Sequence, residues 1–355
     1  MRSVVVGGGS IASAAVEELV NLRTPNHRPN MRDPIQKLLD LGRCLGLLVS
    51  LGAAPLFGCA SASEDVEDEA QDLTRQQCSA LRLPNGSVSA SALGRPFDGS
   101  EDFALDGRGN MIGKRGNDIV AANAAGQLKP GTVASLAGAT FGLRFHPNGS
   151  LIGAMVNEGK IVSVAPNRSV TVLRSGLNGP NGVYVDRSGN VWFTEGGANR
   201  VSRLAPNGDL RVYASGGNAQ GANGIVVDEV AKRLYYTEYD KGRIMRVDLT
   251  APNPVPVEVW IIRGAKLDGL ALDGCGNLYV IDLPNQKLFR LRTNAKGEGL
   301  DLKQLATFPT QVSNIQFGAG AGFDPKSIYV VGYGGSVFPV PVGISGARVP
   351  TPPAP

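Results

Sequence analysis

The sequence predicts an all-β fold, a six-bladed β-propeller whose four-stranded blades surround a central channel. Composition is the first observation: 47 glycines and 23 prolines among 355 residues, with 19% charged residues, are typical of a globular protein rich in tight turns. The second observation is an internal repeat beyond Leu83, in which a few apolar residues, a polar turn and an apolar strand recur. Paired strands repeated at such spacing are the signature of propeller blades.

Six copies of the repeat align, and they read FALDGRGNMIG, LRFHPNGSLIG, VYVDRSGNVWF, IVVDEVAKRLYY, LALDGCGNLYV and IQFGAGAGFDPKSIYV. The residue just before the second strand marks each copy, and successive markers are 40 to 50 residues apart: Asn110, Ser150, Asn190, Arg233, Asn277 and Ser327. Stretches between the copies, such as GKIVSVAPNRSVTVLRSG, supply the other strands of each blade through hairpin turns. We therefore expect the propeller over residues 83–342. A pair of β-sandwiches or a seven-bladed ring would need a different number of copies.

The first part of the chain has the pattern of an export signal. From Met31 a charged start ends at Arg43, and fifteen uncharged, mostly apolar residues follow before Cys59. This run is short for a membrane span and contains Pro55. A signal peptide over residues 31–58 therefore fits better than a transmembrane helix.

The residues that end this run extend the interpretation. The stretch LFGC at 56–59 resembles the lipobox of bacterial lipoproteins, in which the cysteine is acylated and becomes the new N-terminus. We expect an exported protein that is lipid-anchored through Cys59 to a bacterial membrane, facing the periplasm or the cell surface, and that contacts the membrane only through this anchor. The alternative is a cytoplasmic protein with an apolar leader. The flanking segments are then an upstream extension that is not part of the native protein (1–30), an acidic tether (59–82) and a loose Pro-rich tail (343–355).

Cysteine usage and charge limit the other properties of the folded part. If Cys44 leaves with the leader and Cys59 carries lipid, Cys78 and Cys275 remain, and the sequence leaves open whether they form a disulfide or stay free. The net charge is only +4 and both signs are scattered along the chain. The sequence therefore lacks the stripe of Lys and Arg residues that is typical of nucleic-acid-binding proteins, and we expect no nucleic-acid partner.

Polar residues stand at equivalent points of five of the six copies of the repeat, just before the first strand of each copy. Counting back nine residues from each marker, with allowance for the longer turns of the fourth and sixth copies, gives Glu101, Phe141, Asn181, Asn223, Asp268 and Ser313. Because the first strand of a blade lines the channel of a propeller, we expect these residues to ring one end of it. Three of them are followed by glycine, namely Gly182, Gly224 and Gly269. We expect these glycines to let the backbone approach a ligand.

Four of these residues carry oxygen ligands: Glu101, Asn181, Asn223 and Asp268. Two carboxylates that share a buried site repel each other, and a divalent cation between them removes that penalty. An all-oxygen set favours Ca²⁺ above all, with Mg²⁺, Mn²⁺ or Zn²⁺ as alternatives. Zinc prefers His or Cys ligands, of which the exported part offers one histidine, His146. The competing interpretation is that these polar residues only bond turn backbone or face solvent.

At these residues the sequence resembles the family of senescence marker protein, gluconolactonase and luciferin-regenerating enzyme. The resemblance rests on SEDFALD, GPNGVYVDRSGNVWFTE, GANGIVVDEVAKRLYYTE and KLDGLALDGCGNLYVID. It implies a six-bladed propeller with one divalent metal on the axis, and hydrolysis of a sugar lactone. It also implies that Glu101, Asn223 and Asp268 are direct metal ligands and that Asn181 contacts metal or substrate. The chain departs from the family at Gly182, where bacterial gluconolactonases usually have Asp, and at Gly179, where animal members have Arg.

The sequence therefore predicts a metal-dependent hydrolase of a small-molecule lactone or ester. The cation would polarise the lactone carbonyl and Asp268 would take a proton from the attacking water, a role that the resemblance also implies. One alternative is a propeller that binds a ligand through its ion without chemistry. Another is an arylesterase or phosphotriesterase of the paraoxonase type, whose catalytic histidines have no counterpart in this chain.

Overall fold

The computed structural model describes residues 73–352. The predicted upstream extension (1–30), the signal peptide (31–58), the lipidation site Cys59 and the first part of the acidic tether lie outside these residues. Within the described part no helix combines the length and the apolar character that a membrane span requires.

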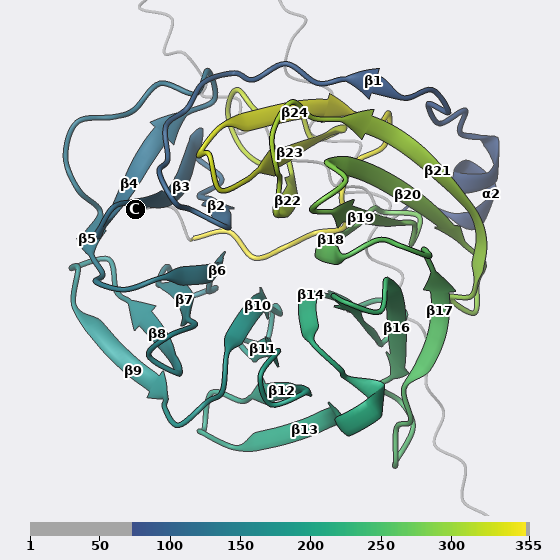
Figure 1. Cartoon of the computed structure of the whole chain (residues 1–355), viewed down its shortest axis with the longest axis horizontal. Coiled ribbons are helices and arrows are strands. Elements are labelled where there is room, and N and C mark those ends of the chain that lie inside the picture. The colour runs from purple at the N-terminus through teal and green to yellow at the C-terminus, as the bar shows by residue number, and fades with distance from the viewer. Residues whose placement is uncertain (1–72, 353–355) are drawn as a thin grey trace, which may run out of the picture. The chain divides into compact units, whose positions relative to one another are not determined.

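The described chain is nearly all β and forms six antiparallel sheets around a central axis, which confirms the six-bladed propeller (Figure 1). Blade 1 contains β2 (Phe103–Leu105), β3 (Asn110–Arg115), β4 (Asp118–Asn123) and β5 (Ala134–Ser135), and blade 2 contains β6 (Thr140–Phe145), β7 (Leu151–Met155), β8 (Lys160–Val164) and β9 (Val170–Arg174). Blade 3 contains β10 (Pro180–Val185), β11 (Val191–Glu195), β12 (Arg200–Leu204) and β13 (Leu210–Ser215), and blade 4 contains β14 (Ala222–Asp228), β15 (Arg233–Glu238), β16 (Arg243–Asp248) and β17 (Val257–Ile261). Blade 5 contains β18 (Leu267–Leu272), β19 (Leu278–Asp282), β20 (Lys287–Thr293) and β21 (Gly299–Thr307), and blade 6 contains β22 (Asn314–Phe317), β23 (Ser327–Val331) and β24 (Val337–Pro341). In each blade the first strand lies nearest the axis (Figure 1).

Blades 5 and 6 depart from the expected four strands because the segment before blade 1 runs along their outer edges. Its strand β1 (Val88–Ser89) pairs in parallel with β21 and gives blade 5 a fifth strand. Farther along, Gly94 forms a bridge with Val337 of the three-stranded blade 6. The N-terminal segment therefore joins the last blade to the first and closes the ring.

The hydrogen bonds of the turn explain why asparagine stands just before the second strand in several copies of the repeat. In blade 3 the Asp186 carboxylate accepts hydrogen bonds from the backbone N–H of Ser188 (3.0 Å) and of Asn190 (2.9 Å), and from the Asn190 side chain. Gly189 adopts a φ of 78°, which an L side chain rarely tolerates. The turn from Asp273 to Asn277 in blade 5 repeats this arrangement. Aspartate and asparagine at this spacing therefore fix the hairpin between the first and second strands.

Further buried carboxylates fasten the opposite ends of the second strands. Glu195 ends β11, is fully buried and accepts two hydrogen bonds of 2.7 Å from Arg200 at the start of β12. Glu238 and Arg243 form the equivalent ion pair in blade 4. In the sequence these pairs are marked by an acid followed five residues later by arginine. These pairs stabilise the hairpins and leave no carboxylate oxygen for a ligand at Glu195.

The segment before the propeller is fixed to blade 5 by a disulfide. The helix α2 (Arg75–Ala80) carries Cys78, which is bonded to Cys275 in the turn between β18 and β19, with 5.6 Å between the two Cα atoms. The structure therefore decides the question that the sequence left open, because these two cysteines form a disulfide.

The segment after the propeller is also packed against it, unlike the loose tail that the sequence predicts. Ile344 is 1% exposed, and the Ala347 N–H donates to the Leu272 carbonyl oxygen at 2.9 Å. A small cavity on the axis is lined by first strands of blades 2 to 6 and by Ala347 and Val349. Apolar residues between the prolines thus hold residues 343–352 across one end of the channel.

Candidate functional site

The strand register places four of the predicted axial residues, Phe141, Asn181, Asn223 and Asp268, at equivalent points of blades 2 to 5. The other two, Glu101 and Ser313, lie just before the first strands of blades 1 and 6. In blade 5 Leu267 pairs with Asp282 and Leu270 with Val280, so that Asp268 and Gly269 form an irregularity, or bulge, between two regular pairs. The same irregularity holds Asn181 in blade 3 and Asn223 in blade 4. Bulges redirect side chains and are frequent beside active sites. Here they lie where the first strands of blades 2 to 5 begin.

The glycines that follow these residues have a different role from the one predicted. A Cβ on Gly182 would overlap the Asn223 carbonyl oxygen, and a Cβ on Gly224 would overlap the Asp268 carbonyl oxygen. A Cβ on Gly269 would lie 2.6 Å from the Cα of Asn314. The glycines therefore allow each blade to approach the backbone of the next blade. The expectation that they make room for a ligand is wrong.

Hydroxyl groups continue these contacts from blade to blade. Thr194 accepts the Gly182 N–H and donates to the Asn223 carbonyl oxygen at 2.6 Å. Thr237 donates in the same way to the Asp268 carbonyl oxygen at 3.0 Å. Across the closure, Ser313 of blade 6 donates to the Glu101 carbonyl oxygen at 2.6 Å. The backbones that carry Asn223, Asp268 and Glu101 are therefore each held by a hydroxyl of the preceding blade.

The two axial carboxylates are buried without full compensation. Glu101 is 2% exposed and Asp268 is 1% exposed, and each has one oxygen, Oε2 and Oδ2 respectively, with no hydrogen-bond partner within residues 73–352. Burial raises the pKa of Glu101 from 4.5 to about 8, and the Asp102 charge adds to the rise while a hydrogen bond from Tyr333 opposes it. Burial also raises the pKa of Asp268 well above its usual value, and the charge of Glu101 adds to this rise. The Glu101 carboxylate is thus close enough to Asp268 for its charge to oppose ionisation of Asp268.

Two tyrosines share this environment. Tyr333, on the loop between β23 and β24, donates a hydrogen bond of 3.1 Å from its hydroxyl to Glu101 Oε1. Its pKa is raised by burial and by the charges of Glu101 and Asp268. Burial and the same two carboxylates also raise the pKa of Tyr239, which follows β15. Lys266 lies over the Tyr239 ring at 5.4 Å from the centroid. None of these three was predicted as a site residue, because nothing in the repeat pattern marks them.

The remaining predicted residues complete the ring by position. Asn223 is 8% exposed, and its backbone adjoins the strand that carries Asp268. Asn181 is partly exposed one blade earlier, and its carbonyl oxygen lies against Gly142 of blade 2. Phe141, also partly exposed, holds the equivalent position in blade 2. Blades 3 and 4 therefore contribute amides where blades 1 and 5 contribute carboxylates.

The neighbouring Asp102 is not available as a ligand. It is fully buried, forms an ion pair with Arg144 and accepts the Leu143 N–H at 2.9 Å. It thereby ties blade 1 to blade 2, while its charge raises the pKa values of Glu101 and Asp268.

The donor chemistry fits a hard divalent cation. Two unpartnered buried carboxylate oxygens, on Glu101 and Asp268, are the atoms that such an ion would satisfy, and Asn181 and Asn223 offer amide oxygens at equivalent points. Across residues 73–352 no group of three or more His, Cys, Asp or Glu side chains could hold a metal ion. A site here would therefore depend on the amides and on water or substrate as further ligands.

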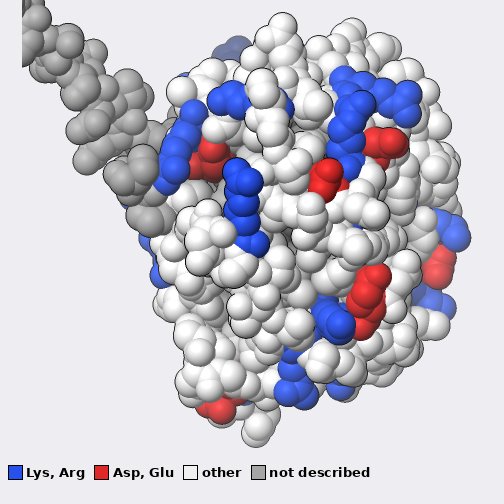
Figure 2. All heavy atoms as spheres, turned by 90° about the vertical axis from the view of Figure 1, so that its left-hand side faces the viewer, with Lys and Arg blue, Asp and Glu red and all other residues white. Residues whose placement is uncertain are grey.

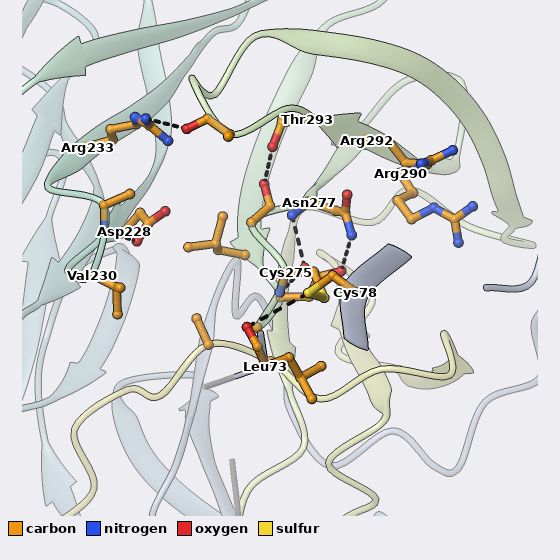
Figure 3. A pocket seen from close by; sticks show the side chains of 18 of the residues that line it. Leu73, Cys78, Asp228, Val230, Arg233, Cys275, Asn277, Arg290, Arg292 and Thr293 are labelled. Carbon is orange, nitrogen blue, oxygen red and sulfur yellow. Dashed lines mark hydrogen bonds between the residues drawn. A yellow bond between two sulfur atoms is a disulfide. The ribbon is translucent and has the colours of Figure 1, made fainter. Parts of the chain in front are cut away.

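A cavity of about 880 Å³ lies elsewhere in the described part (Figure 3). It is lined by turns that follow β14 and β18 and by the disulfide, so it is at the end of these strands opposite to Asn223 and Asp268. Its carboxylates are engaged: Asp228 accepts the Ala231 N–H at 2.7 Å, and Asp273 holds its own turn. This cavity lacks the unpartnered acids of the axial site.

The charged residues on the side of the propeller that carries β4, β5 and β9 show no concentration of one sign. Figure 2 shows Lys and Arg side chains interspersed with Asp and Glu and separated by uncharged residues on this face. This face therefore offers no surface of one charge sign for a strongly charged partner.

Comparison with known proteins supports the fold. No family model matches the sequence, and no curated protein matches it either. Among solved structures, a protein provisionally assigned as a gluconolactonase shares 20% identity over 75% of this chain and 96% of its own, with a TM-score of 0.61. A gluconolactonase from Xanthomonas campestris shares 18% identity over 71% of this chain and 88% of its own, with a TM-score of 0.59. The calcium-binding protein regucalcin from Agrobacterium tumefaciens shares 15% identity over 75% of this chain and 97% of its own, with a TM-score of 0.58. At these identities the likeness shows the fold alone, and this chain has the propeller fold of the gluconolactonases and regucalcin, as its sequence resemblance predicts.

Proposed function

We propose that this protein is a metal-dependent hydrolase of a lactone, with its active site at the axial ring. The observation that carries the proposal is the pair of buried carboxylates, Glu101 and Asp268, each with an unpartnered oxygen. A protein gains nothing in stability from such a pair, so its presence is best explained by a ligand that is positively charged.

The residues that would hold the ion are Glu101, Asn181, Asn223 and Asp268, and Ca²⁺ suits this oxygen set best. When bound, a divalent cation would supply a Lewis acid that polarises the lactone carbonyl and favours ionisation of water. The similarity in fold to a protein described as calcium-binding accords with this assignment.

Asp268 is the residue that we assign to proton transfer. As an ionised carboxylate it would accept a proton from the water that attacks the lactone carbonyl, and Asn181, the more exposed amide, would contact the substrate. Addition of water to the carbonyl carbon, followed by cleavage of the ring C–O bond, yields a hydroxy acid, with the proton returned to the leaving oxygen.

A Ser-His-Asp mechanism has no support among residues 73–352. Their one histidine, His146, has its Nε2 3.2 Å from the Gly189 carbonyl oxygen and accepts the Asn148 N–H through Nδ1. It is a turn residue on the opposite end of β6 from Phe141.

The test is lactone hydrolysis by purified protein that lacks its leader, assayed with gluconolactone and with an aromatic lactone, in Ca²⁺ and in EDTA. We expect hydrolysis to require the ion. The rate should fall at least about 100-fold in Asp268→Asn, because this change removes the general base. The control is Asp209→Asn, since Asp209 is exposed in a turn between β12 and β13. Ion binding without hydrolysis of any lactone would instead support a ligand-binding propeller. Activity that is unchanged by EDTA or by Asp268→Asn would contradict the proposal.

We further propose that the protein is exported and anchored to a bacterial membrane through Cys59. The disulfide between Cys78 and Cys275 supports an oxidising compartment. Labelling cells with a radioactive fatty acid, with Cys59→Ser as the control, tests the anchor. Equal labelling of both proteins would refute it.

A further inference from the structure

The contact between Tyr333 and Glu101 crosses the closure of the ring. Glu101 precedes β2 of blade 1, whereas Tyr333 belongs to the loop between β23 and β24 of blade 6. The Tyr333 hydroxyl donates to Glu101 Oε1 at 3.1 Å. The tyrosine is 41% exposed while the glutamate is 2% exposed, so the hydrogen bond joins a buried carboxylate to a side chain that reaches the surface.

The loop that carries Tyr333 is fixed to the segment that leads into Glu101. The Gly335 N–H donates to the Gly332 carbonyl oxygen at 2.7 Å and tightens the loop around the tyrosine. The Phe97 N–H donates to the Gly335 carbonyl oxygen at 3.3 Å, and Arg95 Nε donates to the Gly334 carbonyl oxygen. At Gly335, where φ is 73°, a Cβ would overlap the Phe97 carbonyl. The position of the tyrosine relative to Glu101 is therefore set by backbone contacts on both sides.

These contacts leave Glu101 with one unpartnered side-chain oxygen. Its carbonyl oxygen accepts the Ser313 hydroxyl at 2.6 Å and its Oε1 accepts the Tyr333 hydroxyl, whereas its Oε2 is buried and unpartnered. We propose that Tyr333 is a positioning residue that holds the Glu101 carboxylate with Oε2 free to ligate the axial cation. This inference rests on the cation site of the proposed function, and it adds a hydrogen-bonded support of the kind that orients metal ligands in other proteins.

Tyr239 provides a matched comparison. It lies on the loop between β15 and β16 of blade 4, so that Tyr239 and Tyr333 flank blade 5 and Asp268. Both are influenced by the charges of Glu101 and Asp268. However, within residues 73–352 only the Tyr333 hydroxyl donates a hydrogen bond to either carboxylate. Removing the Tyr239 hydroxyl therefore changes the same environment without removing the support of Glu101.

The experiment compares Ca²⁺ binding by the intact protein, Tyr333→Phe and Tyr239→Phe, using isothermal titration calorimetry. We expect the dissociation constant of Tyr333→Phe to rise by about 10-fold or more, which is typical for loss of such a support, and that of Tyr239→Phe to change less than about twofold. Thermal midpoints in EDTA should stay similar for all three proteins, which separates positioning from a general loss of stability. Equal Ca²⁺ affinity of Tyr333→Phe and the intact protein would overturn the inference.

A second measurement separates failure of this inference from failure of the proposed function. If the intact protein binds no divalent cation, the proposed function fails, and crystal structures of the intact protein and Tyr333→Phe decide the role of the tyrosine. We expect the Glu101 carboxylate to turn away from its original orientation in Tyr333→Phe. An unchanged carboxylate in that structure would overturn the positioning role.

Discussion

Because the axial carboxylates are buried, we expect the ion-free protein to lose stability as the pH rises. A divalent cation should reverse this loss. Glu101 has a pKa raised by burial from 4.5 to about 8, so the folded protein favours its neutral form. Its contribution to stability is therefore fully present below pH 4.5 and is lost as the pH rises towards about 8. Between pH 5 and pH 8 the loss from this group alone is about 3–4 kcal/mol. Asp268, whose pKa is also raised, acts in the same direction.

The assay is thermal unfolding at pH 5 and at pH 8, with EDTA or with Ca²⁺ at each pH. A loss of this size corresponds to a decrease of the thermal midpoint on the order of 5–10 °C in EDTA. Calcium should raise the midpoint more at pH 8 than at pH 5, because protons compete with the ion for the carboxylates. In Glu101→Gln, which has no charge to lose, the pH dependence in EDTA should shrink. A midpoint in EDTA that is flat or rises from pH 5 to pH 8 would refute the reasoning.

Two further changes test contacts that stabilise the propeller. Gly224→Ala should lower the free energy of unfolding by at least about 1–3 kcal/mol, because the new Cβ would overlap the Asp268 carbonyl oxygen. Gly217→Ala, where nothing lies within 4 Å of the added atom, is the control and should stay within about 0.5 kcal/mol in urea denaturation. Replacing Cys78 and Cys275 by serine should cost about 2–5 kcal/mol in the same assay, because the disulfide closes a separation of 197 residues in the unfolded chain. Equal urea midpoints of the glycine variants, or of the serine variant and the intact protein, would contradict these two accounts.

The repeat predicted the fold and the equivalence of the axial positions, because both depend on local features. Asn190 and Asn277 mark the turns through hydrogen bonds to aspartates four residues earlier. In blades 3 and 5 the first strand has the same length, so counting back from the turn residue reaches the axial residue at the start of the strand. These axial residues are Asn181 and Asp268.

Features that depend on neighbouring blades could not be predicted in this way. Gly224 meets the backbone of Asp268, and Tyr333 meets Glu101 across 232 positions of sequence. A pattern repeated within a blade says nothing about which side chain the next blade presents. The same reason explains why the bridge between Gly94 and Val337 was missed.

The outer edges of blades 5 and 6 have a consequence for how the chain reaches its final state. The residues at Val88 and Gly94 leave the ribosome early, yet their partners Ala306 and Val337 emerge last. The circle is therefore completed only after nearly all of the polypeptide has been synthesised, and contacts so distant in sequence form slowly. Until then the edge of β24 is an open strand that another polypeptide could pair with. We expect protection of this strand in hydrogen exchange to develop after that of blades 2 to 4 during refolding.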